Sequence, residues 1–386
     1  MSRAVAQRRS GFVLPGAIIA LVLLSTLVVG ALFVATEELR AGRSDVADQR
    51  ALTVAEHGIE QTIASWEAVR NTALVVGETV RDDVPPTADG DVVEVTMTRT
   101  QPRAVWIVAH AVARDGRPTP ARRALGASLR LVGPSFTLRA ALTAAGAVTV
   151  ESGGVIDGQN GQNGTPAVVR AAWCAGESAA SVAGVMAPDT ARVCGAECTG
   201  GVPPGVFGVP AVAMEALVSS DSVFRAFGDE SRISLAARAS VVLGAGTLTP
   251  RPVVSGAKCD VTVALNWGDP DGATPCADHY PIVWVRGDAV LAAGAMGQGI
   301  LLVDGDVTIE AGARFAGVVV ASDDVIVRGD GAEIVGATFA ADADGADGTR
   351  VSDGGAIRFG RCAARAAMLG ASRLVRTPGR WWAELR

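Results

Sequence analysis

Bulky aromatic side chains are scarce in this chain: only 4% of its 386 residues are Phe, Trp or Tyr, and there is a single tyrosine. Glycine is abundant instead, with 46 residues, and 49% of the chain is hydrophobic. A core with few aromatic rings has to be filled by small and β-branched side chains. The composition therefore favours a mainly β architecture, and the length predicts two or more domains.

Residues that usually carry chemistry are also rare. The three histidines, His57, His110 and His279, are too scattered to support a Ser-His-Asp or Cys-His arrangement, and no P-loop or Rossmann fingerprint occurs. Of the 34 basic residues only Lys258 is a lysine, and the net charge is -6. This charge balance argues against nucleic acid as a partner.

Charge is absent from one long stretch, Phe12 to Thr36, whose 25 residues include no Asp, Glu, Lys, Arg or His. As a helix rising about 1.5 Å per residue it spans a hydrocarbon core of about 30 Å, so we expect a transmembrane helix over 12–36. Segment 1–11 is basic, with Arg3, Arg8 and Arg9. Basic charge on the short N-terminal side predicts that this side stays in the cytoplasm and the remainder is exported.

Three kinds of N-terminal segment fit this hydropathy. A secretory signal peptide has a shorter apolar core followed by small residues, which Val28 to Ala35 supply. A plain signal anchor explains the apolar run without further features. A third kind is indicated by the junction itself, where the basic leader meets the apolar helix with no spacer.

The junction residues Gly11, Phe12, Val13 and Leu14 resemble a class III (type IV prepilin) signal. The resemblance implies that a prepilin peptidase cuts after Gly11, that the new N-terminal Phe12 is methylated, and that the helix is kept. It also implies a single-pass inner-membrane protein whose bulk is periplasmic or lies extracellularly on a filament.

The fifth residue counted from Phe12 is Gly16, whereas most major pilins have Glu there and pair it with the N-terminal amine of the neighbouring subunit. The segments 37–42 (EELRAG) and 48–60 (DQRALTVAEHGIE) are similar to the N-terminal pattern of PilX-type pilus assembly proteins. The resemblance implies a structural or assembly component of a type IV pilus or pseudopilus, minor-pilin-like. Its partners are other pilins or pilus assembly proteins and the inner membrane; no enzyme activity and no cofactor are expected.

Residues 37–70 continue the helix with an amphipathic stripe that includes Leu39, Leu52, Ala55 and Ile59. The period then changes to that of strands, at 91–99, 105–113 and 122–132, with turn residues between them. We therefore expect a pilin-like α+β section in which a β meander within 71–135 lies on the helix.

An internal repeat follows. Asp306-Val-Thr-Ile aligns with Asp324-Val-Ile-Val at an offset of 18, and Ala316-Gly-Val-Val with Val335-Gly-Ala-Thr at 19. Short β-branched runs with Gly corners at such a period predict coils of a β-solenoid (β-helix). We place it at 136–158 and 281–360, interrupted by an insertion over 159–280 that is either a disulfide-tied excursion or an independent domain.

The cysteines are even in number and all follow the apolar run, so disulfides are the expected state of an exported chain. A structural zinc site at Cys194-Gly-Ala-Glu-Cys198 is the alternative, although no histidine accompanies it; we expect no metal. Cys259 with Cys276 is one plausible local pairing. The six candidate disulfide residues are Cys174, Cys194, Cys198, Cys259, Cys276 and Cys362.

Clustered acids support an alternative function, a membrane-anchored cell-surface β-solenoid that binds or cleaves polysaccharide. Paired carboxylates of a glycosidase must face each other across the substrate, whereas adjacent strand residues point to opposite faces. Asp342-Ala-Asp-Gly-Ala-Asp is oxygen-rich like a calcium loop, and a solvated turn is the other interpretation. The candidate acids are Asp269, Asp271, Asp323, Asp324, Asp342, Asp344 and Asp347.

The C-terminal segment 361–386 is expected to form a helix from Cys362 to Val375 that caps the solenoid end, followed by a tail. Trp381 and Trp382 in that tail either pack against the solenoid end or form a contact surface.

Overall fold

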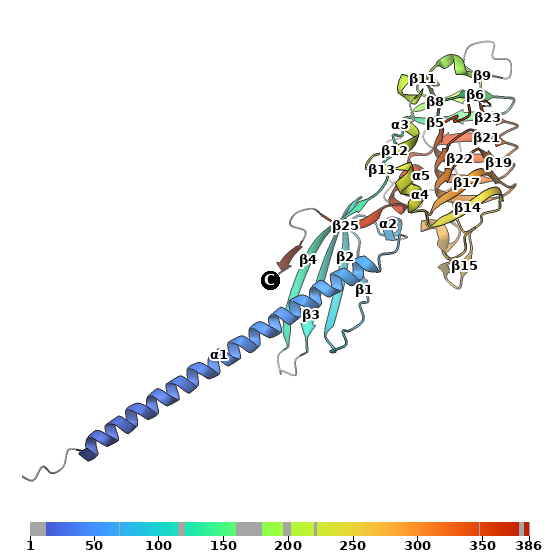
Figure 1. Ribbon diagram of the computed structural model, residues 1–386. Coiled ribbons are helices and arrows are strands. Elements are labelled where there is room, and N and C mark those ends of the chain that lie inside the picture. The colour runs from blue at the N-terminus through green and yellow to red at the C-terminus, as the bar shows by residue number, and fades with distance from the viewer. Residues whose placement is uncertain are drawn as a thin grey trace, which may run out of the picture.

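The computed structural model describes residues 13–68, 70–114, 120–159, 180–195, 202–219, 222–346, 348–377 and 382–385. The protein is mainly β with one long N-terminal helix, as the sequence predicts. Figure 1 shows three parts in a row: the helix, an antiparallel sheet packed on its second half, and a large curled parallel sheet beyond.

Helix α1 (Val13–Ala64) has 52 residues, which is about 78 Å at the standard rise. Its side chains are exposed from Leu14 to Val46, and from Ala47 onward one face of the helix is buried while residues such as Glu56 and His57 stay exposed. Val54, Ala55 and Ile59 pack on the antiparallel sheet, and Gly58 permits close approach because a Cβ there would lie 2.6 Å from Val93 Cγ2. The first half of α1 is therefore exposed, whereas its second half packs on the antiparallel sheet.

The antiparallel sheet contains the predicted meander. Alternate residues such as Val105, Ile107 and Ala109 face α1 and are fully or almost fully buried. Its consecutive strands are β1 (Thr79–Asp82), β2 (Val92–Gln101), β3 (Ala104–Ala113) and β4 (Ala121–Val132).

Two C-terminal strands complete this sheet. Both β25 (Arg373–Arg376) and β26 (Trp382–Leu385) pair antiparallel with β4. We expected the helix to reach Val375 and the tail to lie on the solenoid end; the structure instead returns the chain to the meander, and Figure 1 places the C-terminus beside β4. Strand β3 pairs with one edge of β4, and pairing with β25 and β26 satisfies the backbone N–H and C=O groups of its other edge.

The parallel sheet has 16 strands within the described residues and winds as a solenoid. Successive coils repeat at the predicted offsets, with Met296 opposite Arg314 and Arg314 opposite Glu333. The strands of the regular coils are β17 (Ile282–Leu291), β18 (Met296–Val303), β19 (Val307–Ile309), β20 (Arg314–Ala321), β21 (Val325–Arg328), β22 (Glu333–Ala340), β23 (Gly348–Ser352) and β24 (Ala356–Phe359).

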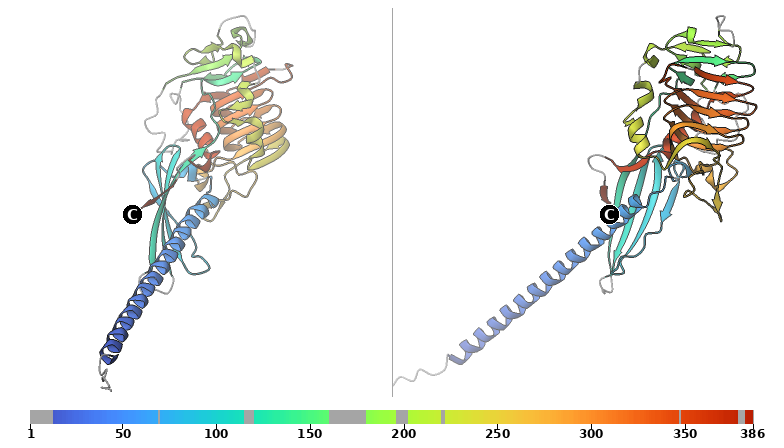
Figure 2. Two further views of the ribbon diagram at one scale, coloured as in Figure 1. Left: turned by 60° about the vertical axis from the view of Figure 1, so that its left-hand side comes forward. Right: turned by 45° about the vertical axis from the view of Figure 1, so that its right-hand side comes forward.

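The coils do not follow one another in chain order. The far end is formed by the strands β5 (Ala140–Ala144), β6 (Ala147–Val150), β7 (Val155–Asp157), β8 (Ala183–Ala187), β9 (Val193–Gly195), β10 (Val206–Phe207) and β11 (Val212–Met214). The chain then returns along the side and starts the near end with β14 (Val241–Leu248). The two sets of coils meet where β5, β6 and β7 pair with β22, β23 and β24 (Figure 2).

The segment 159–280 is therefore not only an excursion: five of its strands, β8 to β11 and β14, extend the solenoid. The returning part and the near-end loop hold short elements. These are η3 (Ala216–Ser219), α3 (Ser222–Arg225), β12 (Ala226–Phe227), β13 (Glu230–Ser231), α4 (Arg232–Ala237), β15 (Val254–Ser255), β16 (Lys258–Cys259) and η4 (Pro275–Asp278). A further short element, η2 (Thr190–Arg192), lies between β8 and β9 at the far end.

Helix α5 (Arg361–Gly370) covers a side of the solenoid, not its end. It packs on the outer faces of β18, β20 and β22, where Ile300, Val318 and Val320 point away from the interior. The expected end cap is thus a lateral cover, because these outward apolar side chains also need burial. A second short helix, α2 (Arg70–Ala73), follows α1, which ends at Ala64 and not near residue 70 as we expected.

Candidate functional site

The exposed half of α1 is the largest bare apolar surface among the described residues. Leu14, Leu21, Leu24 and Phe33 are 62–74% exposed, and by length and composition this is the one described helix able to cross a membrane. A Cβ added at Gly16 would meet nothing within 4 Å. The predicted processing residues, Gly11 and Phe12, lie outside the described residues.

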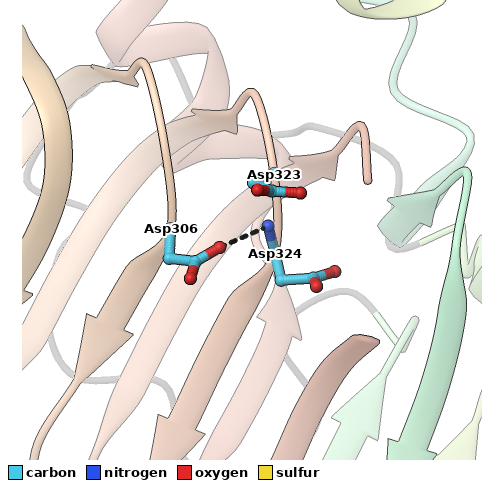
Figure 3. Close-up of side chains that lie close together, drawn as sticks. All are labelled: Asp306, Asp323 and Asp324. Carbon is cyan, nitrogen blue, oxygen red and sulfur yellow. Dashed lines mark hydrogen bonds between the residues drawn. The ribbon is translucent and has the colours of Figure 1, made fainter. Parts of the chain in front are cut away.

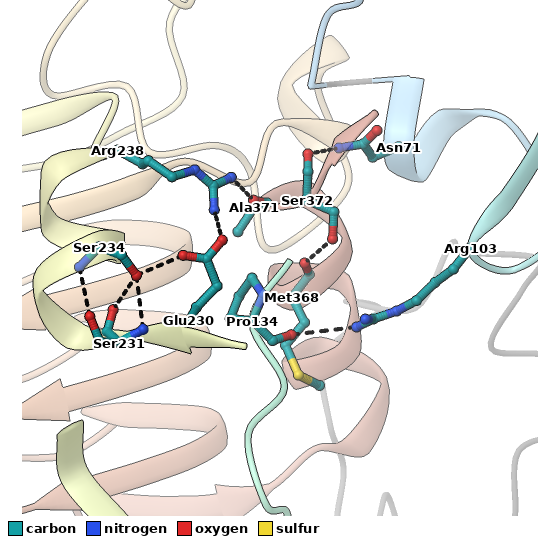
Figure 4. Close-up of polar contacts among 10 residues, drawn as sticks. All are labelled: Asn71, Arg103, Pro134, Glu230, Ser231, Ser234, Arg238, Met368, Ala371 and Ser372. Carbon is teal, nitrogen blue, oxygen red and sulfur yellow. Dashed lines mark hydrogen bonds and ion pairs between the residues drawn. The ribbon is translucent and has the colours of Figure 1, made fainter. Parts of the chain in front are cut away.

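A polar junction joins the helix–sheet part to the solenoid (Figure 4). Asn71 of α2 is fully buried, and its side-chain amide donates to the backbone oxygen of Ser372 at 2.7 Å. The Asn71 amide oxygen accepts a hydrogen bond from the Trp66 indole at 2.8 Å, and the Thr72 hydroxyl donates to Asp278 O at 3.0 Å. The hydrogen bonds from Asn71 to Ser372 and from Thr72 to Asp278 therefore hold the solenoid in place relative to α1, and they leave these buried polar groups paired.

A second polar cluster fastens the returning segment to α5 (Figure 4). Arg238 forms an ion pair with Glu230, a 7% exposed residue, and donates to Ala371 O at 2.6 Å. Ser231 caps α4, with Ser234 returning the hydrogen bond in a capping box. The long-range contacts of these clusters, Asn71 with Ser372 and Arg238 with Ala371, were not anticipated, because the sequence carries no local signal for them.

Disulfides are present in the structure. Cys259 and Cys276 are bonded to each other and tie the near-end loop. Cys194 and Cys362 each take part in a disulfide as well. No described cysteine is free. Cys174 and Cys198 lie outside the described residues.

The first pair of candidate acids has a structural arrangement. Asp269 is 3% exposed and accepts hydrogen bonds from the backbone N–H groups of Asp271 and Thr274, at 3.0 and 2.6 Å. Asp271 forms an ion pair with Arg314. The two carboxylates thus hold a loop and a neighbouring coil, and they do not face each other across a cleft as glycoside chemistry requires.

The other acids form a ladder along one corner of the solenoid (Figure 3). Asp288 accepts a hydrogen bond from Asp306 N at 3.1 Å, and Asp306 accepts one from Asp324 N at 3.0 Å. Asp323 in turn accepts one from Asp344 N at 3.3 Å. The repeat contained this signal, since Asp288, Asp306 and Asp324 are spaced by 18, but the sequence did not reveal the role of the carboxylates in joining coils.

The ladder concentrates negative charge. The acids Asp306, Asp323 and Asp324 have oxygens within 4.8 Å of one another, as do Asp323, Asp342 and Asp344. Burial, followed by the neighbouring carboxylates, raises the pKa of Asp324 to about 7. The pKa values of Asp306 and Asp342 are also raised, first by burial. Oxygen-only groups of this kind suit calcium in general. Asp306, Asp323 and Asp344 already accept backbone hydrogen bonds, whereas Asp342 Oδ1 has no partner among the described residues. Asp347 lies outside the described residues.

Comparisons with known proteins identify no family for this chain. No protein-family model matches the chain, and no curated protein matches it. One similar solved structure is the competence-associated pilin ComZ from Thermus thermophilus, at 11% identity and a TM-score of 0.24, covering 89% of this chain and 96% of that chain. Similarity at this level does not assign a role.

Proposed function

We propose that the protein is a structural or assembly component of a type IV pilus or related pseudopilus, minor-pilin-like, with the solenoid as its exported head. One observation carries the proposal: α1 has a bare apolar half that runs directly into a half packed on an antiparallel meander. A long N-terminal apolar helix with this layout fits a pilin. The action is mechanical, with α1 held in the inner membrane until it packs against the helices of other pilins.

Gly16 argues against a role as the main filament subunit. Gly16 has no carboxylate to pair with a neighbouring subunit's N-terminal amine, and its surroundings are open. We therefore propose that the protein has a minor role, at the filament tip or in filament initiation, and is not a main filament subunit. No enzymatic activity, cofactor or nucleic-acid partner belongs to this proposal.

The test is the N-terminal residue of the full chain isolated from membranes, read by peptide mass spectrometry with and without an active prepilin peptidase. We expect a peptide starting at methylated Phe12 only with the peptidase, and a Gly11→Val variant that stays uncut. Gly16→Ala is the matched control and should be processed normally. An intact Met1 or Ser2 start would indicate a signal anchor, and cleavage near Ala35 a signal peptide; either contradicts the proposal.

A second measurement separates filament subunit from assembly factor. Sheared filaments are analysed by mass spectrometry for peptides from the solenoid, such as those around Trp284. Their presence at a low ratio to the main pilin is expected for a minor subunit. Their absence, with a processed Phe12 terminus, would identify a membrane assembly factor instead.

A further inference from the structure

The acidic corner of the solenoid concentrates negative charge. The name covers five acids that lie before β19, β21 and β23 on three successive coils: Asp306, Asp323, Asp324, Asp342 and Asp344. None of the five belongs to an ion pair among the described residues, and Arg328 of β21 pairs with Glu310 instead. Arg192 lowers the pKa of Asp342, which burial and Asp323 raise, but its guanidinium donates to Ala145 O at 3.1 Å. The corner therefore carries charge that the described residues do not neutralise.

Two carboxylate oxygens at this corner accept no hydrogen bond from the described residues. Asp324 is only 2% exposed, and its one side-chain hydrogen bond runs from the Thr349 hydroxyl to Oδ1 at the long distance of 3.4 Å, so that Oδ2 accepts none. The second oxygen is Asp342 Oδ1, which is buried and also unpartnered. Because a buried carboxylate oxygen without a donor or a cation is unfavourable, these two oxygens point to a positively charged ligand.

The spacing of the carboxylates fits one kind of cation. Calcium binds oxygen at about 2.3–2.6 Å, so two oxygens on one ion lie at most about 5 Å apart. The acids form two overlapping groups, Asp306 with Asp323 and Asp324, and Asp323 with Asp342 and Asp344, and within each group the oxygens lie within 4.8 Å of one another. Magnesium requires distances of about 2.0–2.1 Å and a nearly ideal octahedron, which suits this wider spacing less well.

The hydrogen bonds between coils leave room for such an ion. Asp306 uses Oδ1 to accept from Asp324 N, and Asp323 uses Oδ1 to accept from Asp344 N (Figure 3 shows the first of these). A carboxylate has two oxygens with about four lone-pair sites, so each of these acids keeps an oxygen for a cation. Asp344 is exposed, which gives an ion access from the solvent.

We propose that the acidic corner binds Ca²⁺, with Asp323 as the ligand common to both groups and the unpartnered oxygens of Asp324 and Asp342 among the other ligands. Water supplies the remaining ligands on the exposed side. The bound ion joins three coils and fixes the loop that begins at Asp342, for which a calcium loop and a solvated turn were the two interpretations. The inference does not depend on the pilus role and goes beyond it.

The test is isothermal titration calorimetry of the full chain in detergent micelles, stripped of metal with EDTA, dialysed and titrated with CaCl₂. We expect saturable binding with a Kd below about 1 mM. Asp323→Asn should weaken binding at least about tenfold, because both groups lose a charged ligand. Asp342→Asn should also weaken it about tenfold. Asp342 has a φ of 51°, which asparagine tolerates, so this variant keeps the backbone of the loop.

The matched control is Asp288→Asn, which should bind calcium like the wild type. Asp288 accepts the same kind of backbone hydrogen bond, from Asp306 N, but belongs to neither group. Circular dichroism in EDTA verifies that each variant is folded. Absence of binding up to about 10 mM calcium, or wild-type affinity in both Asp323→Asn and Asp342→Asn, would overturn the proposal. Equal affinity for magnesium would overturn the assignment to calcium. An uncut N-terminus would refute the pilus role and leave this result unaffected.

Discussion

At the scale of single residues, glycines make the corners of the solenoid. Gly299, Gly317 and Gly336 lie in register on adjacent coils, and all three have positive φ angles. A Cβ at Gly317 would lie 2.1 Å from Gly299 O, so the coils stack closely only because these side chains are absent. This explains the excess of glycine in a chain poor in aromatic residues.

Gly317→Ala tests the corner. The variant combines a disfavoured φ of 138° with a backbone clash, and we expect it to lose more than about 2 kcal/mol of unfolding free energy. Urea denaturation followed by tryptophan fluorescence measures the loss. Gly244→Ala is the control, because nothing lies within 4 Å of its Cβ. A Gly317→Ala variant as stable as this control would show that the corner tolerates a side chain.

Asp324 makes the stability depend on pH. Its pKa rises from 3.8 to about 7 on folding, so the folded state binds the proton more tightly than the unfolded state. This contribution favours folding at low pH and is lost as pH rises from about 4 to 7, by at most about 1.4 kcal/mol per pH unit. Asp324→Asn should therefore be more stable than the wild type at pH 8, by roughly 1–3 kcal/mol, with a flatter pH profile.

Thermal unfolding at pH 5 and pH 8 measures the effect. Asp288→Asn is the control, since this exposed acid lies at the same corner, and it should change stability by less than about 0.5 kcal/mol. Equal pH profiles for Asp324→Asn and the wild type would mean that Asp324 is ionised in the folded protein throughout this range.

At the scale of elements, the chain crosses twice between the meander and the solenoid. It leaves the meander after β4 and returns from α5 into β25, which pairs with β4. The short helix α2 sits beside this return and is held by Asn71. The orientation of the solenoid on α1 thus depends on a few buried polar contacts along with the packing of Leu369 and Leu374.

Asn71→Ala tests this joint. It leaves the Trp66 indole and the Ser372 carbonyl without their partner, at an expected cost of about 1–3 kcal/mol. Hydrogen exchange with mass spectrometry should show faster exchange in β25, with β20 and β22 unchanged. Gln101→Ala, at an exposed residue of β2, should leave both regions unchanged. Uniform loss of protection throughout the chain would mean that the two parts unfold as one unit.

At the scale of the whole molecule, one helix serves two environments. The bare half of α1 suits lipid or other helices, and the buried half anchors the folded head. Figure 2 shows the solenoid at the opposite end of the molecule from the start of α1.

Leu24→Arg tests whether the bare half enters a membrane. Leu24 is 62% exposed, and an arginine near the middle of a spanning helix costs about 2.5–3.5 kcal/mol of insertion free energy. We expect a reduced membrane fraction after carbonate extraction, with Leu24→Ala still retained. Full retention of the arginine variant would indicate that this stretch is not a spanning segment.

Much of the architecture could be predicted because it depends on local patterns. The charge-free run after Phe12 predicts an apolar helix, alternation in residues 91–132 predicts the meander, and the 18-residue offset between Asp306 and Asp324 predicts parallel coils. Each of these features follows from side chains close together in the sequence, where hydrophobic period and turn residues decide the conformation.

The tertiary structure alone decided how these parts join. It placed strands from 159–280 at both ends of the solenoid, moved α5 to its side, and returned β25 and β26 to β4. Several sheet edges offer equivalent backbone hydrogen bonds, so local sequence does not select among them. The choice depends on packing and polar contacts between distant residues, such as Asn71 with Ser372 and Arg238 with Ala371.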